Sequence, residues 1–197
     1  MFPPNVVIVA GPAASGKTTF ATRLALRSSS CLFDLDQITA PLVQQCLVLL
    51  DQPEYALDQE LGRTLRPARY DSLLAAATAN IVLGRDVVIA APFSREISSP
   101  PAWQRMVARW SSAGPSSAPV NTELLYVQCP PALLRERLVR RGEPRDRLKI
   151  ESGADLSSPA PVVEHHVVDG AADLDREVDR LLDELHGGRP PVRAAGV

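Results

Sequence analysis

Short, largely apolar runs alternate along the chain with longer stretches of helical periodicity. The runs cover residues 6–10, 31–34, 86–91, 123–128 and 165–168. Uninterrupted apolar runs such as VVIVA, rich in β-branched residues, are typical of strands buried on both faces of a sheet. The alternation therefore predicts an α/β fold, in which helices flank a doubly wound, five-stranded parallel sheet.

Helices are expected between and after these strands. They cover residues 17–27, most of 38–84, 103–110, 130–140 and 174–185. The clearest part of the second stretch begins near Pro67, because proline is favoured in a first helical turn, and stops at Gly84. The last helix has one apolar stripe and is expected to end at Gly187.

The length of 197 residues suits one domain with a sizeable core, predicted to span residues 1–188. Within it, residues 39–84 are expected to form a helical segment on the acceptor side. Residues 141–161 are polar and interrupted by proline and glycine, which predicts a mobile lid that carries arginines. Residues 189–197 are expected to form a disordered tail.

Composition argues against several classes of protein. The formal net charge of -2 gives no electrostatic case for binding nucleic acid or an anionic membrane. The three cysteines are too few and too scattered for a disulfide framework or a zinc cluster. No signal peptide is recognisable, and no apolar run approaches the ~20 residues of a spanning helix. A soluble cytoplasmic protein is expected, and its oligomeric state stays open.

The first strand leads into a glycine-rich loop, GPAASGKT, at residues 11–18. It matches the phosphate-loop pattern G-x-x-x-x-G-K-[ST] in full, with the required strand before it and helix after it. Glycines permit the turn and a close approach of backbone N–H groups to phosphate. Lys17 can reach the β- and γ-phosphates, and the Thr18 hydroxyl can ligate Mg²⁺. The sequence therefore predicts binding of ATP with Mg²⁺. The expected nucleotide ligands in the loop are Gly11, Ala13, Ala14, Ser15, Gly16, Lys17, Thr18 and Thr19.

Two aspartates mark the end of the second strand, in the segment FDLDQI. Residues two apart in a strand point the same way, so Asp34 and Asp36 are expected to converge on a cleft. A motor ATPase has little use for a second carboxylate there. In a phosphotransferase one can help to hold the metal, while the other orients an acceptor hydroxyl and takes its proton. The alternative is a pair of solvated aspartates at a strand end.

Arginines crowd the segment LRERLVRRGEPRDR, at residues 134–147. Charge on a transferred phosphoryl group calls for guanidinium groups that approach it and exclude water. Arg137, Arg141 and Arg145 would line one face if the helix continued. We expect Arg137 to contact the nucleotide, and Arg141 and Arg145 to act on the transferred group. The alternative is a solvated helix face with i,i+4 ion pairs, which best suits Arg135 and Arg140.

Together, the phosphate loop, the Asp-x-Asp strand end and the R-x-x-x-R-x-x-x-R-D segment resemble the small P-loop kinases of the nucleoside-monophosphate-kinase-like fold. The resemblance in layout covers residues 5–186. It is nearest to the branch of chloramphenicol phosphotransferase, zeta toxins and the kinase domain of polynucleotide kinase, and the Asp-Leu-Asp step is also similar to shikimate and gluconate kinases. It implies the strand order 2-3-1-4-5. It also implies that Asp36 is the hydroxyl-activating aspartate and that Arg141 and Arg145 are lid arginines.

The chain departs from many P-loop proteins at the end of its third strand. Ala90 and Ala91 stand where a magnesium-associated acid is often found. This absence argues against a standard motor ATPase. We therefore expect Asp34, together with Thr18, to hold the metal.

The acceptor is expected to contact residues 39–69 and the residues that follow the third strand. Arg63 and Arg69 could meet an anionic or hydroxylated compound, or could belong to a solvated helix face. Phe93 could stack on an aromatic ring or pack in the core. No basic groove interleaved with aromatic residues is present, so a small molecule is a better acceptor than a polynucleotide.

Three functions remain open. The favoured one is an ATP-dependent kinase that acts on a hydroxyl of a small metabolite, nucleoside-like compound or antibiotic. The second is a polynucleotide or sugar-nucleotide kinase. The third is a nucleotide-binding regulatory or resistance protein with little transfer activity.

Overall fold

Five parallel strands form one sheet in the computed structural model, which describes residues 5–111, 120–151, 156 and 160–186, without the side chains of Asp58, Arg145 and His186. The strands are β1 (Asn5–Ala10), β2 (Cys31–Asp34), β3 (Val87–Ala90), β4 (Asn121–Gln128) and β5 (His166–Asp169). Their order is β2-β3-β1-β4-β5, and each neighbouring pair is parallel. The predicted sheet and strand order are confirmed.

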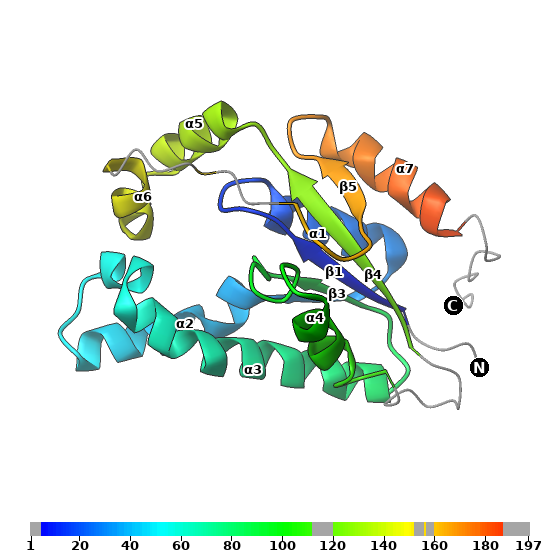
Figure 1. Ribbon diagram of the computed structural model, residues 1–197, viewed down its shortest axis with the longest axis horizontal. Coiled ribbons are helices and arrows are strands. Elements are labelled where there is room, and N and C mark those ends of the chain that lie inside the picture. The colour runs from blue at the N-terminus through cyan, green and yellow to red at the C-terminus, as the bar shows by residue number, and fades with distance from the viewer. Residues whose placement is uncertain (1–4, 112–119, 152–155, 157–159, 187–197) are drawn as a thin grey trace.

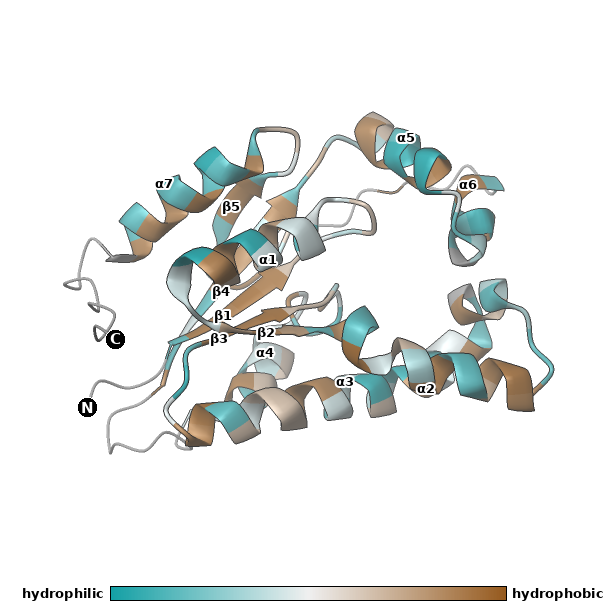
Figure 2. Cartoon of the chain, turned by 180° about the vertical axis from the view of Figure 1, so that it is seen from behind, coloured by the Kyte–Doolittle hydropathy of each residue, from teal (hydrophilic) through white to brown (hydrophobic). Residues whose placement is uncertain are grey.

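Helices cover both faces of this sheet (Figure 1). On one face, α1 (Lys17–Ser28) and α7 (Leu174–His186) bury Phe20 and Val178 against the sheet. On the other, α3 (Glu60–Val82) and α4 (Pro100–Val107) cover a core that includes Leu73 and Met106. Apolar colour is concentrated on β1 and β3, while the covering helices also carry polar bands (Figure 2). No helix in the described part of the chain is long and apolar enough to cross a membrane.

The remaining elements gather where the strands end. They are α2 (Leu35–Leu49), the 3₁₀ turn η1 (Glu54–Asp58), α5 (Pro131–Arg141), the 3₁₀ turn η2 (Pro144–Asp146) and α6 (Arg147–Glu151). In Figure 1, α5 and α6 lie on one side of an opening and α2 with α3 on the other. At its far end η1 contacts η2 and α6. This placement agrees with the rule that ligands of open α/β sheets bind beyond the carboxyl ends of the strands.

The predicted start of α3 was wrong. The helix expected to start near Pro67 begins at Glu60, so the proline lies inside α3. The first turn of α3 packs closely on η1, where a Cβ on Gly62 would lie 1.8 Å from the Leu57 carbonyl oxygen. The expected irregular lid contains η2 and α6, whereas its residues 152–155 and 157–159 lie outside the described part, as do the expected cap at 187 and the tail. Movement of the lid stays a prediction.

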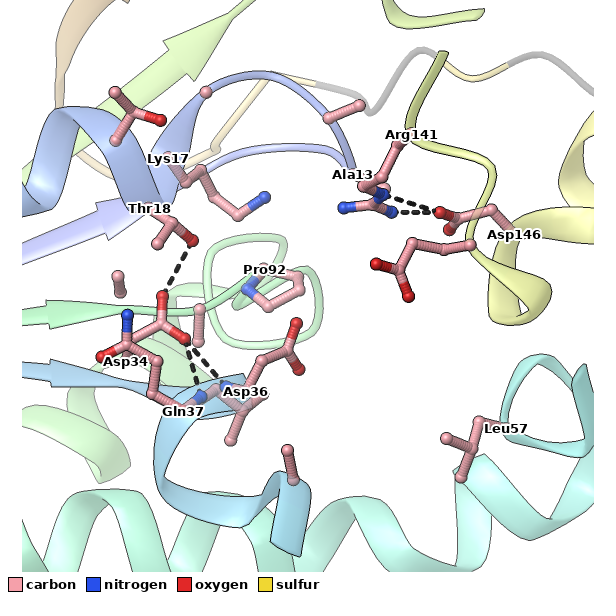
Figure 3. Close-up of a pocket in the computed structure, with 18 of the residues that line it drawn as sticks. Ala13, Lys17, Thr18, Asp34, Asp36, Gln37, Leu57, Pro92, Arg141 and Asp146 are labelled. Carbon is pink, nitrogen blue, oxygen red and sulfur yellow. Dashed lines mark hydrogen bonds and ion pairs between the residues drawn. The ribbon is translucent and has the colours of Figure 1, made fainter. Parts of the chain in front are cut away.

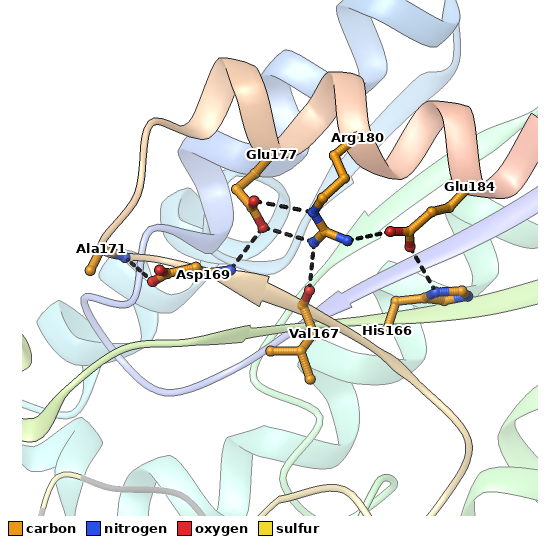
Figure 4. A network of polar contacts seen from close by, with 7 residues as sticks. All are labelled: His166, Val167, Asp169, Ala171, Glu177, Arg180 and Glu184. Carbon is orange, nitrogen blue, oxygen red and sulfur yellow. Dashed lines mark hydrogen bonds and ion pairs between the residues drawn. The ribbon is translucent and has the colours of Figure 1, made fainter.

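The last strand and the last helix are joined by a polar network around Arg180 (Figure 4). The Arg180 guanidinium donates to the carboxylates of Glu177 and Glu184 and, at 2.8 Å, to the Val167 carbonyl oxygen. Glu177 also accepts a hydrogen bond of 3.0 Å from the Asp169 backbone N–H. Because Asp169 ends β5, this network fixes the loop between β5 and α7, which lies against the phosphate loop.

Candidate active site

The phosphate loop connects β1 to α1 and is held tightly against β4. Gly11 has φ 144°, and a Cβ on it would lie 2.5 Å from the Val127 carbonyl oxygen, so no other residue fits without displacing backbone. Gly16 is the N-cap of α1, with φ 102°. The loop therefore ends at the amino terminus of a helix, where the backbone N–H groups and the helix dipole favour an anion.

Lys17 lies within the loop. Its ammonium donates a hydrogen bond of 2.6 Å to the Pro12 carbonyl oxygen. Burial lowers the pKa of Lys17 to about 8, although the nearby carboxylates of Asp36 and Asp34 act in the opposite direction. The side chain remains mostly protonated at neutral pH, as a group that binds phosphate must.

Asp34 joins the phosphate loop to the start of α2. It ends β2 and is the N-cap of α2, and its Oδ1 accepts hydrogen bonds of 2.9 and 3.1 Å from the backbone N–H groups of Asp36 and Gln37. Its Oδ2 accepts a hydrogen bond of 2.9 Å from the Thr18 hydroxyl, as Figure 3 shows. The residue is only 5% exposed. Both carboxylate oxygens are therefore fixed by named partners.

This pair of side chains fits magnesium. Mg²⁺ prefers hard oxygen ligands and is usually bound by one or two protein groups together with substrate phosphates and water. Thr18 and Asp34 offer a hydroxyl and a carboxylate side by side in the cleft. Ala90 and Ala91 line the same cleft without contributing a ligand. Within the described residues no group of three or more His, Cys, Asp or Glu could hold a metal alone, so phosphate would have to complete the shell.

Asp36 reaches the cleft by a different route from the one predicted. The alternation of a strand does not apply to it, because the chain enters α2 at Leu35 and Asp36 lies in the first helical turn. Asp36 nevertheless lines the same cleft as Asp34. Its Oδ1 accepts a hydrogen bond of 2.6 Å from Arg69, whose Nε donates at 2.9 Å to the Thr39 hydroxyl. Arg69 also lines the cleft, where it holds the carboxylate of Asp36.

The arginines of α5 do not form one continuous face. The helix stops at Arg141, and Gly142 closes it in the left-handed conformation. Arg145 therefore lies in η2, off the predicted stripe, and its side chain is outside the described part. Arg141 lines the cleft and donates two hydrogen bonds to Asp146, which is 1% exposed. Asp146, for which no role could be predicted from the sequence, fixes the direction of this guanidinium.

Arg137 contacts the backbone of the phosphate loop. Its guanidinium donates to the carbonyl oxygens of Gly170 at 2.9 Å, Ser15 at 3.3 Å and Ala14 at 3.4 Å. It also lines the cleft, and its contact with the nucleotide stays a prediction. A Cβ on Gly170 would lie 2.5 Å from the Ser15 carbonyl oxygen, so the β5–α7 loop and the phosphate loop touch directly. Sequence reasoning missed Gly170, because nothing local to it signals this contact.

Two expected acceptor contacts are not supported. Arg63 is exposed on α3 and does not line the cleft. Phe93 has no exposed surface and packs edge-to-face on Tyr70, with ring centroids 5.5 Å apart. The prediction that Phe93 touches the acceptor was wrong, because the chain turns after Pro92 and directs this side chain into the core.

The cleft as a whole has a volume of about 990 Å³. Several residues that line the cleft had no site role predicted from the sequence, and one of them, Arg140, was assigned to a solvated helix face. The lining residues without a predicted site role include Glu54, Leu57, Arg140, Glu143 and Lys149. The sequence could have indicated a site role for Lys149, since it is one of only two lysines in a chain otherwise rich in arginine. Glu54 and Glu143 look like ordinary surface residues in the sequence.

Comparison with known proteins agrees with this architecture. Residues 6–156 match the AAA_33 family, described as an AAA domain. No curated protein matches the sequence.

Among solved structures, a provisionally named kinase from Chloroflexus aurantiacus J-10-fl has a TM-score of 0.67 at 20% identity, over 95% of this chain and 99% of that one. A sugar kinase from Janibacter sp. HTCC2649 has a TM-score of 0.62 at 18% identity, over 93% and 95%. A gluconokinase from Sinorhizobium meliloti 1021 has a TM-score of 0.56 at 19% identity, over 96% and 100%. The chain therefore belongs to the AAA_33 family and has the fold of the small P-loop kinases that its motifs resemble.

Proposed function

We propose that this protein is an ATP-dependent kinase that transfers the γ-phosphoryl group to a hydroxyl of a small molecule. One observation carries the proposal. The phosphate-loop residues Lys17 and Thr18 and the carboxylate of Asp36 line a single cleft. The sugar kinase and gluconokinase among the structural neighbours support it, since their names describe the same reaction class.

On the phosphate side, the chain supplies positive charge and orientation. Backbone N–H groups at the start of α1 and the ammonium of Lys17 bind the phosphates, and Arg141 approaches from α5. Thr18 and Asp34 would hold Mg²⁺, which when bound neutralises phosphate charge and so favours transfer. Asp146 keeps the Arg141 guanidinium in place at the cleft. Positioning of this kind is the main protein contribution to phosphoryl transfer.

On the acceptor side, Asp36 orients the hydroxyl. The acceptor oxygen forms a bond to the γ-phosphorus while the bond from that phosphorus to the bridging oxygen of ADP breaks. The hydroxyl proton passes to the Asp36 carboxylate, and ADP leaves with the electron pair of the broken bond. Arg69 fixes the carboxylate by the 2.6 Å hydrogen bond.

Among the alternatives, the absence of an acid at Ala90 and Ala91 favours a nucleotide-binding protein with little transfer. A polynucleotide acceptor is disfavoured because the sequence contains no basic groove interleaved with aromatic residues.

The test is transfer from γ-labelled ATP to a mixed panel of hydroxylated metabolites, nucleosides, antibiotics and oligonucleotides, with products resolved by mass. We expect a product heavier by one phosphoryl group. Asp36→Asn should lose transfer by about a hundredfold or more while retaining ATP affinity. ATP binding without transfer to any acceptor would favour the regulatory alternative, and wild-type transfer by Asp36→Asn would refute the role of Asp36.

A further inference from the structure

The two walls of the cleft differ in charge. The wall formed by the phosphate loop, α5, η2 and α6 is basic: its five cations outnumber the carboxylates of Asp34, Glu143 and Asp146. Asp34 and Asp146 are hydrogen-bonded to Thr18 and Arg141, respectively. The cations on this wall are Lys17, Arg137, Arg140, Arg141 and Lys149. Such a wall suits the charge of a triphosphate.

The opposite wall, which we call the acceptor wall, consists of cleft residues from α2, η1 and α3. Its charged members are Asp36, Glu54 and Arg69. The Arg69 guanidinium is already engaged by the Asp36 carboxylate and the Thr39 hydroxyl. The acceptor wall therefore carries two carboxylates against one guanidinium, and that guanidinium is committed to one of them.

Glu54 carries the remaining charge of the acceptor wall. It is the first residue of η1 and is half-buried. Its carboxylate makes no side-chain hydrogen bond or ion pair within the described residues. The same wall also carries the apolar residues Ala40, Val43 and Leu57 and the neutral Gln37 and Gln44. A partly desolvated carboxylate in such surroundings favours a cationic hydrogen-bond donor.

We propose that the acceptor is a small hydroxylated amine, such as an amino alcohol or amino sugar, whose ammonium pairs with Glu54 while its hydroxyl faces Asp36. This inference rests on the proposed kinase function. A carboxylate-bearing acceptor would meet Glu54 and Asp36 with no guanidinium left uncommitted on that wall, and like charges in a partly dry site oppose binding. At the far end of the cleft, η1 contacts η2 and α6.

Binding of matched probes tests the inference without requiring transfer. The full chain, loaded with Mg²⁺ and a non-hydrolysable ATP analogue, is titrated with serinol, glycerol and glycerate, and then with glucosamine, glucose and glucuronate, by ligand-observed NMR. In each series the amine replaces one hydroxyl of the neutral compound, and the acid is the neutral compound with one terminal CH₂OH oxidised to a carboxylate. We expect the amine to bind about tenfold more tightly than the neutral alcohol, and the acid most weakly.

Variants assign the preference to Glu54. Glu54→Gln should abolish the advantage of the amine, and Glu54→Lys should reverse the order in favour of the acid. Glu60→Gln is the matched control, because Glu60 is exposed at the start of α3 and does not line the cleft. Retained binding of the ATP analogue verifies that each variant is folded. An acid that binds as well as its amine, amines that bind no better than their alcohols, or a preference that survives Glu54→Gln would each overturn the inference.

The same samples separate this inference from the proposed function. Amine binding through Glu54 without any phosphoryl transfer would refute the proposed kinase function but support the preference for a cationic acceptor. Phosphoryl transfer to an acid in preference to its amine would establish the kinase function but refute the preference for a cationic acceptor.

Discussion

The Arg69 guanidinium lies 2.6 Å from the carboxylate of Asp36 and thereby connects α3 to the first turn of α2. The Asp36 side chain is 51% exposed, and this contact constrains its direction. We expect Arg69→Ala to lower kcat for transfer by about tenfold to a hundredfold, because a displaced carboxylate no longer orients the acceptor hydroxyl. Steady-state kinetics at saturating ATP measures this, and the KM for ATP should stay unchanged.

Arg63→Ala is the control for that substitution. It removes the same side chain from the same helix, at an exposed position that does not line the cleft. Its kinetics should match those of the unmodified protein. Equal rates for Arg69→Ala and Arg63→Ala would show that Arg69 does not position Asp36.

Asp34 combines a structural and a chemical role that two substitutions can separate. Asn is as good an N-cap as Asp, so Asp34→Asn should keep the α2 cap, whereas Asp34→Ala should lose about 1 kcal/mol of unfolding free energy. Both should weaken Mg²⁺-dependent ATP binding by about tenfold, since both remove the carboxylate beside Thr18. Urea unfolding and ATP titrations with and without Mg²⁺ distinguish the two roles. Unchanged Mg²⁺-ATP affinity in Asp34→Asn would place the metal elsewhere.

Much of the fold and of the phosphate site could be predicted because the signals are local. The VVIVA strand, the glycine-rich loop and the helix after it are adjacent in sequence, so their geometry follows from short-range rules. The route of Asp36 was mispredicted because strand alternation was extended past Asp34, which is an N-cap residue. Gly142 indicates in the sequence that the helix ends there. The face shared by Arg137, Arg141 and Arg145 required the helix to continue past this glycine, so Arg145 was misplaced.

The remaining site features depend on tertiary contacts that no local pattern encodes. The hydrogen bond from Arg137 to Gly170 joins residues 33 positions apart, and the one from Arg69 to Asp36 likewise spans two elements. The burial of Phe93, in the segment between β3 and α4, depends on its packing against Tyr70 of α3. Aromatic side chains fit both a core and a ligand site, so hydropathy alone could not choose between them.

Gly170 provides a test of the contact between the β5–α7 loop and the phosphate loop. A Cβ there would lie 2.5 Å from the Ser15 carbonyl oxygen and 2.9 Å from that of Gln128. Gly170→Ala should lower the free energy of unfolding by about 1–3 kcal/mol and weaken ATP binding, because the phosphate loop must shift to relieve the overlap. Thermal unfolding and ATP titration measure the two effects. Ala171→Ser, an exposed change in the same loop, should alter neither. Wild-type ATP affinity in Gly170→Ala would show that the phosphate loop tolerates the displacement.

Glu177 should make stability depend on pH in the acidic range. The hydrogen bond from Arg180, with that from the Asp169 backbone N–H, lowers the pKa of Glu177 below its usual value of 4.5, although burial opposes the shift. Its side chain is only 15% exposed. A carboxyl group whose pKa is lower in the folded state stabilises that state above pH 4.5, and this contribution is lost as the pH falls through the folded-state pKa.

Glu177→Gln should therefore lower the free energy of unfolding at pH 7 by about 1–2 kcal/mol. The difference from the unmodified protein should shrink steadily below pH 4.5, because protonation removes the same interaction from the unmodified chain. Urea unfolding across a pH series measures both quantities. Asp183→Asn, which removes one negative charge from an exposed position on the same helix, should show a smaller and nearly constant effect. If the deficit of Glu177→Gln were equally large at every pH, the Arg180 network would not be the source of the stabilisation.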